Sequence, residues 1–111
     1  MQSTRVVIET IQIKFEVTDE KGQAGRASIV LVSNELHPVP YALLEDVFVR
    51  EDVRGSGVST ELVRSCIKEA SSRGCYKLIL CHTPGILTAW YARKFGFKLS
   101  GNMEMRLDLP G

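Results

Sequence analysis

The chain has 111 residues, which predicts one small domain over 1–111, with length for a core but none to spare for a second. A hydrophobic content of 44% and a charged content of 24% are ordinary for globular proteins and argue against disorder. The net charge of +1 gives no general reason to expect nucleic acid or an anionic membrane as a partner. Any anion site must therefore be local.

The first half of the chain predicts an antiparallel meander. From Ile11 to Val17 apolar and polar residues alternate, which is typical of a strand with one buried face. Two prolines, Pro38 and Pro40, interrupt strand pairing later on. We expect, in order, a strand over 5–17, a turn at 19–23, a strand over 24–33 that completes an N-terminal hairpin, a loop over 34–40 and a strand over 41–49.

The second half predicts helices alternating with strands. Apolar residues at 58, 62, 63, 66, 67 and 70 have the spacing of one helix face. We expect a helix over 57–73, a strand over 76–81, a turn at 82–85, a helix over 86–95, and one or two closing strands from 97–99 and 103–109. Because a helix connects them, the strands over 41–49 and 76–81 should be parallel. The order β-β-β-α-β-α-β predicts an α+β (mixed α/β) fold with helices on the faces of a mixed sheet.

Three cysteines, Cys66, Cys75 and Cys81, lie within or beside apolar runs, and no Cys-x-x-Cys occurs. An odd number of this kind favours a reduced, cytoplasmic protein with buried thiols. Only His37 and His82 could join the cysteines as ligands, so we expect no metal site. The N-terminal ten residues lack the apolar core of a signal peptide, and no stretch approaches the ~20 apolar residues of a membrane span.

The stretch 43–63 carries the first chemical signal. An apolar strand leads through Arg54-Gly55-Ser56-Gly57 into a helix. The unpaired N–H groups and the dipole of a helix N-terminus attract anions, and glycines let the backbone approach a phosphate closely. The alternative interpretation is an exposed turn that ends a strand, but a turn needs only one glycine.

These residues resemble the GNAT (N-acetyltransferase) superfamily, in which an R/Q-x-x-G-x-G/A loop opens a helix. Here the run is Asp52-Val53-Arg54-Gly55-Ser56-Gly57, and the later run Ala89-Trp90-Tyr91 to Gly96-Phe97 is similar to the family's second motif. The pair of motifs is more specific than either alone. LEDVFV followed by RGSG is most similar to the diamine and related amine acetyltransferases. The resemblance covers roughly residues 40–109 and implies an acetyl-CoA-binding core over 41–109.

The resemblance implies direct transfer of an acetyl group from acetyl-CoA to an amine, without a metal. It implies that Tyr91 protonates the leaving thiolate. As a carboxylate inside the strand, Glu45 is the candidate base that takes the proton of the acceptor, with water as the alternative. The resemblance also implies a set of residues that bind acetyl-CoA: Val47, Phe48, Val49, Arg54, Gly55, Ser56, Gly57, Val58, Ser59, Thr60 and Tyr91. The acceptor could be a small amine, a lysine side chain or a protein N-terminus.

For several of these residues a structural role competes. Glu45 and Asp46 are adjacent, so we expect them on opposite sheet faces, with one of them facing a covered face or a cleft. A buried carboxylate has a raised pKa and suits a general base, whereas the alternative is an ion pair with a residue such as Arg50. Tyr91 and Trp90 could simply fill space between helix and sheet. A Cys81–His82 acyl-enzyme is disfavoured, because adjacent strand residues point to opposite faces.

The sequence also departs from the family. Asp52 stands where members have Gln or Arg, and Ser59 where glycine is common. The hairpin over 5–33 has no room for the two helices that members place between their first two strands, so the chain is expected to be a minimal member. Its acceptor side is then open or completed by another subunit, which makes a homodimer a hypothesis. A non-catalytic acyl-CoA-binding module or an interaction subunit remains the alternative function.

Overall fold

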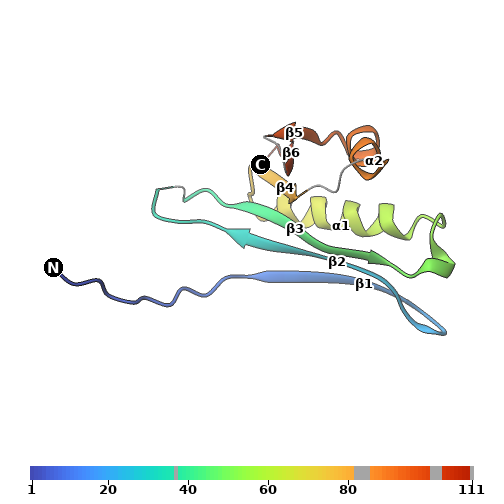
Figure 1. Cartoon of the computed structure of the whole chain (residues 1–111), viewed down its shortest axis with the longest axis horizontal. Helices are drawn as coiled ribbons and strands as arrows, with labels where there is room; N and C mark the ends of the chain where they lie inside the picture. The colour runs from blue at the N-terminus through green and yellow to red at the C-terminus, as the bar shows by residue number, and fades with distance from the viewer. Residues whose placement is uncertain (37, 82–85, 101–103, 111) are drawn as a thin grey trace.

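The computed structural model describes residues 1–36, 38–81, 86–100 and 104–110. This part of the chain forms a six-stranded sheet with two α-helices and a short 3-10 helix (Figure 1). The elements are β1 Gln12–Asp19, β2 Gly22–Val32, β3 Tyr41–Val49, η1 Glu51–Val53, α1 Val58–Ser72, β4 Lys77–Cys81, α2 Ile86–Phe95, β5 Lys98–Ser100 and β6 Glu104–Asp108. The predicted α+β fold is confirmed, and the third strand has the predicted bounds.

The strands lie in the order β1-β2-β3-β4-β6-β5. β3 and β4 are parallel, as the connecting helix α1 requires, and the other neighbouring pairs are antiparallel. The closing segment forms two strands, and β6 lies between β4 and β5. The central parallel pair is therefore flanked by antiparallel strands on both sides.

The prediction that the first strand starts at residue 5 is wrong. Residues 1–11 have no regular structure, and Val6, Val7 and Ile8 are exposed. β2 ends at Val32, and its Leu31 N–H donates to Ile11 O at 2.9 Å. β2 therefore has hardly any residues left to pair with the segment before Ile11. Beyond that point the N-terminal segment continues away from the sheet, and the molecule measures 57 × 30 × 26 Å (Figure 1).

The turn between β1 and β2 is shorter than predicted, because Asp19 pairs with Gly22 and leaves only Glu20 and Lys21 outside the strands. Gly22 adopts φ 110°, a conformation that glycine reaches without steric cost. Within 12–32 no helix therefore separates the first two strands, as expected. None of the helices in the described residues is long and apolar enough to cross a membrane.

The core lies between the sheet and α1, which runs behind β3 in Figure 1. Small residues on β2 and β3, Ala27 and Ala42, let the helix approach the sheet closely. The residues buried in this cluster include Ile29, Leu44, Leu62, Val63, Cys66, Ala70, Leu78, Tyr91, Phe97 and Met105. Because Cys66 of α1 and Tyr91 of α2 belong to one cluster, the core extends continuously from α1 to α2.

Candidate active site

β3 and β4 pair over only three rungs, from Ala42 with Leu78 to Leu44 with Leu80. Just beyond this ladder β3 carries a β-bulge. On its other side Ser28 of β2 pairs with Glu45 and Arg26 pairs with Phe48, so two residues of β3 oppose one of β2. A bulge bends its strand and increases the local twist. The two parallel strands therefore part at this point.

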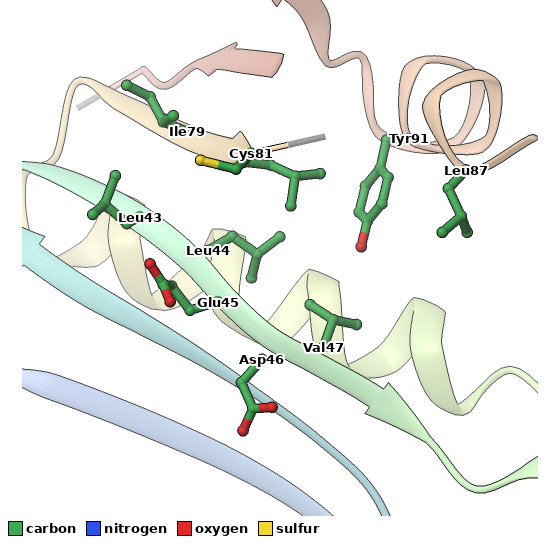
Figure 2. Close-up of a pocket in the computed structure, with 10 residues that line it drawn as sticks. Leu43, Leu44, Glu45, Asp46, Val47, Ile79, Cys81, Leu87 and Tyr91 are labelled. Carbon is green, nitrogen blue, oxygen red and sulfur yellow. The ribbon is translucent and has the colours of Figure 1, made fainter. Parts of the chain in front are cut away.

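A cleft of about 370 Å³ lies where the strands part (Figure 2). Its walls come from β3, β4 and α2, and are formed by Leu43, Leu44, Glu45, Asp46, Val47, Ile79, Leu80, Cys81, Leu87 and Tyr91. The walls are mostly apolar. The lining residues with polar side chains are Glu45, Asp46, Cys81 and Tyr91, of which Asp46 directs its side chain away from Tyr91 (Figure 2). Sequence reasoning missed the contribution of Leu87, whose position depends on how α2 packs.

Tyr91 is the most enclosed polar group of the cleft, at 7% exposed. Its hydroxyl points toward β3 in Figure 2 and has no hydrogen-bond partner within the described residues. Burial raises the pKa of Tyr91, so the hydroxyl keeps its proton at neutral pH. Trp90 packs edge-to-face on Tyr91 and Phe95, with ring centroids 4.9 and 5.1 Å apart, which agrees with its expected packing role.

The expectation that Glu45 or Asp46 faces a covered face or a cleft is met only at the cleft, because neither carboxylate is buried. Glu45 and Asp46 are both exposed, because Asp46 occupies the bulge with φ 54° and interrupts the alternation of the strand. Both nevertheless line the cleft. The Glu45 side chain has no hydrogen bond or ion pair within the described part of the chain. Asp46 is paired, as the alternative interpretation held, but with Arg26 at 2.8 Å rather than with Arg50.

The predicted phosphate loop is open on its outer side. Gly55 and Gly57 adopt φ 84° and 93°, and a Cβ added at either would meet nothing within 4 Å. Gly57 is the N-cap of α1 and has no side chain with which to make a cap hydrogen bond. The first helical bond runs from Glu61 N–H to Gly57 O at 3.0 Å, so the earlier N–H groups of the first turn have no acceptor in the helix. Ser59 and Thr60 lie in this first turn.

Two other residues of the loop bind the protein itself. Ser56 donates both its N–H and its hydroxyl to Val53 O. Arg54 Nε donates to Val49 O at 3.0 Å, which connects the loop to the end of β3. These contacts fix the shape of the loop, and the predicted role of both residues toward pyrophosphate stays a prediction.

The place of Asp52 in the motif has a structural explanation. Asp52 binds Arg50 at 2.5 Å and Lys21 at 3.3 Å, and Arg50 also binds Asp19 at 2.5 Å. Arg50 further donates to Gln23 O at 3.2 Å. Arg50 and Lys21 hold the pKa values of both aspartates below the ordinary range. These contacts hold the turn of the N-terminal hairpin against the segment that leads into the predicted phosphate loop.

The cysteines differ from one another. Cys66 and Cys75 are buried as predicted, and burial raises the pKa of Cys66 to about 12. Cys81 is exposed at the end of β4 and lines the cleft, so the expectation of a buried thiol is wrong there. His82 and the predicted turn at 82–85 lie outside the described residues. Within the described residues no three His, Cys, Asp or Glu side chains are grouped to hold a metal ion.

Similar proteins place this arrangement in a family. The acetyltransferase (GNAT) family model matches residues 13–97. Glucosamine 6-phosphate N-acetyltransferase 1 of rice (Oryza sativa subsp. japonica) is 44% identical over 64 residues, which are 58% of this chain and 37% of the rice protein. Glucosamine 6-phosphate N-acetyltransferase of Trypanosoma brucei brucei is 36% identical over 66 residues, which are 60% of this chain and 43% of that protein. The matches thus span less than half the length of these relatives.

Solved structures agree in fold. The crystal structure of glucosamine-6-phosphate N-acetyltransferase from Arabidopsis thaliana superposes with a TM-score of 0.71 at 22% identity, over 83% of this chain and 64% of that one. An acetyltransferase of Trypanosoma brucei gives 0.73 at 27% identity, over 88% and 69%. The family match over most of the described sheet, together with the cleft between the parting strands, shows that this chain belongs to the GNAT acetyltransferase family.

Proposed function

We propose that this protein transfers an acetyl group from acetyl-CoA directly to a primary amine in the cleft between β3 and β4. The observation that carries the proposal is the cleft itself. There Tyr91 directs a protonated hydroxyl, which has no hydrogen-bond partner in the part of the chain that the structure describes, toward a strand whose pairing with β4 has just ended. Family membership supplies the donor class.

In this proposal acetyl-CoA binds along β3 and the start of α1. The pantetheine arm lies against the backbone of Val47, Phe48 and Val49, which have no β4 partner. The pyrophosphate accepts hydrogen bonds from the N–H groups of Gly55, Gly57, Val58 and Ser59. The hydroxyls of Ser59 and Thr60 and the cation of Arg54 assist. The open space beyond both glycines and the absence of a side-chain cap on α1 support this assignment.

The reaction then needs three groups of the chain. The amine nitrogen attacks the thioester carbonyl, and the N–H of Val47 stabilises the oxyanion. The carbon–sulfur bond breaks, and Tyr91 gives its proton to the sulfur. Glu45 takes the proton of the acceptor amine, directly or through water. Its exposure on the cleft supports access to solvent, with which it exchanges that proton.

We propose an amino sugar phosphate as the first acceptor to test, because both curated relatives reported above carry glucosamine 6-phosphate in their names. Diamines, a lysine-containing peptide and a peptide N-terminus complete the panel. A cytoplasmic location and a homodimer belong to the same proposal. The dimer is tested by light scattering, in which a monomer at high protein concentration would contradict it.

The experiment incubates the purified protein with acetyl-CoA and each acceptor, and follows released thiol and acetylated product. The proposal expects acceptor-dependent thiol release with an equal amount of product. Binding of acetyl-CoA without transfer to any acceptor would instead indicate the non-catalytic acyl-CoA module. A melting temperature that acetyl-CoA does not raise would favour an interaction subunit.

A further inference from the structure

The bulge beside the cleft contains strained backbone. Asp46 is the one non-glycine residue in the described part of the chain with a positive φ, 54°. An L-residue in this region brings its Cβ close to the backbone, so the conformation persists only where the surroundings hold it. Asp46 lies two residues beyond the last rung between β3 and β4 and directly before Val47. The strain therefore sits where the parting of the strands begins.

Arg26 of β2 holds this residue. Its Nε lies 2.8 Å from Asp46 Oδ2 and its Nη2 lies 3.2 Å from Asp46 Oδ1, a two-point contact that fixes the carboxylate in orientation as well as position. The guanidinium also lies over the Phe48 ring, 4.6 Å from its centroid, and donates to Gln23 Oε1 at 3.1 Å. Arg26 thus contacts the residues on both sides of Val47.

The contact faces away from the reacting groups. Figure 2 shows the Asp46 side chain directed away from Tyr91 and β4. Both carboxylate oxygens of Asp46 are bound to Arg26, and this pairing holds the pKa of Asp46 below its usual range. The pair is accordingly not arranged as a proton acceptor in the cleft. It lies instead beside the backbone that joins Asp46 to Val47.

We infer that Arg26 is a positioning residue, which holds Asp46 in its left-handed conformation and thereby aims the Val47 backbone at the thioester carbonyl. The inference rests on the proposed function for the role of Val47. An ordinary surface ion pair contributes little to stability. The pair of Arg26 and Asp46 differs from it in that its loss lowers the rate of acetyl transfer.

Two substitutions of Asp46 distinguish the effect of its backbone conformation from the effect of its carboxylate. Asp46→Ala and Asp46→Gly both remove the carboxylate, but only glycine adopts φ 54° without steric cost. We expect Asp46→Ala to lower kcat about tenfold while the KM for acetyl-CoA stays unchanged, and Asp46→Gly to keep kcat within about threefold. Equal losses in the two variants would overturn the inference, since they would give the carboxylate itself the role.

A second experiment introduces Arg26→Met into the parent protein and into Asp46→Gly. The substitution removes the two-point contact and the guanidinium over Phe48, and keeps an unbranched apolar chain at this position. We expect about a tenfold loss of kcat in the parent protein and less than twofold in the Asp46→Gly background, because nothing then remains to be held. A raised acceptor KM in both backgrounds would assign Arg26 to acceptor binding, and no change in either would leave an ordinary ion pair. Both results contradict the inference.

A readout independent of turnover keeps the inference separate from the proposed function. Amide hydrogen exchange of the peptide over 44–49 should accelerate when Arg26→Met is added to the parent, and should not change when it is added to Asp46→Gly. The same acceleration in both backgrounds would overturn the inference, even if the parent transferred no acetyl group. Failure of the parent to transfer or to bind acetyl-CoA counts against the proposed function alone.

Discussion

Leu44 of β3 and Leu80 of β4 form the last rung of the parallel ladder, and both line the cleft that opens beyond it. From Glu45 onward β3 keeps β2 as its neighbour and loses β4. The short parallel ladder thus joins the two halves of the sheet. Because it ends at Leu44 and Leu80, it leaves space for the cleft between β3 and β4.

Tyr91→Phe tests the proposed proton donor. The ring stays in place, so stability should change by less than about 1 kcal/mol. We expect kcat to fall about tenfold, less than the ~100-fold usual for proton transfer, because the thiolate of a thiol with a pKa of about 8.5 leaves without much help. The matched control is Tyr76→Phe, which alters a tyrosine outside the cleft. Identical kinetics of the two variants would remove the Tyr91 hydroxyl from the mechanism.

Glu45→Gln tests the proposed base. Glu45 lines the cleft without an ion partner in the described residues, so the amide should be accommodated without loss of stability. We expect at least about a tenfold fall in kcat with unchanged affinity for acetyl-CoA, measured by calorimetry. The control is Glu61→Gln, a carboxylate in the first turn of α1 that does not line the cleft. Full turnover in Glu45→Gln would show that water, and not Glu45, takes the proton of the acceptor amine.

The ion pairs of Arg50 predict a pH dependence of stability. Arg50 lowers the folded-state pKa of Asp19 and Asp52 below the ordinary value of 3.8. A lowered pKa means that this stabilisation is complete above that value and is lost as the pH falls through the folded pKa values. We expect the melting temperature of the parent to fall more steeply below about pH 4 than that of Arg50→Met. Parallel curves would show that the contacts contribute nothing to folding.

Gly25 of β2 marks a close approach between the sheet and the start of α1. A Cβ there would lie 2.9 Å from Val58 Cγ1 and 3.0 Å from Phe48 O. Gly25→Ala should therefore lower the free energy of unfolding by about 1–3 kcal/mol, as overpacking does. Adding Val58→Ala removes one of the clashing atoms and should restore part of that loss in urea unfolding. Strict additivity of the two substitutions would contradict the close approach.

The sequence predicted most of the fold because its patterns are local. The apolar run over 41–49 and the alternation from Ile11 to Val17 are readable without tertiary information. The start of the first strand was mispredicted because Val6, Val7 and Ile8 favour a strand while β2 offers no partner that far. Strand propensity is expressed only where a neighbouring strand exists.

The candidate phosphate loop is also marked locally in the sequence. Gly55 and Gly57 adopt positive φ values, which glycine reaches without steric cost, and their contacts with pyrophosphate stay a prediction. The bulge was missed, although two adjacent acidic residues inside an apolar strand were its visible signal. Arg26, which binds Asp46, and Lys21, which binds Asp52, belong to the N-terminal hairpin, and only the assembled hairpin brings them close. Arg50 is a sequence neighbour of Asp52 and binds it locally.

The central claim is that acetyl-CoA binds with its pyrophosphate on the loop that opens α1, and Gly57→Glu tests it most directly. Gly57 has φ 93° and open space beyond its Cα, so the substitution strains one residue and places a carboxylate where the phosphates are expected. The measurement is a calorimetric titration of acetyl-CoA into the parent and the variant, with circular dichroism to confirm the fold. Saturable binding by the parent and none by a folded Gly57→Glu is the predicted result. Equal affinity of the two proteins, or no binding by the parent, would contradict the account.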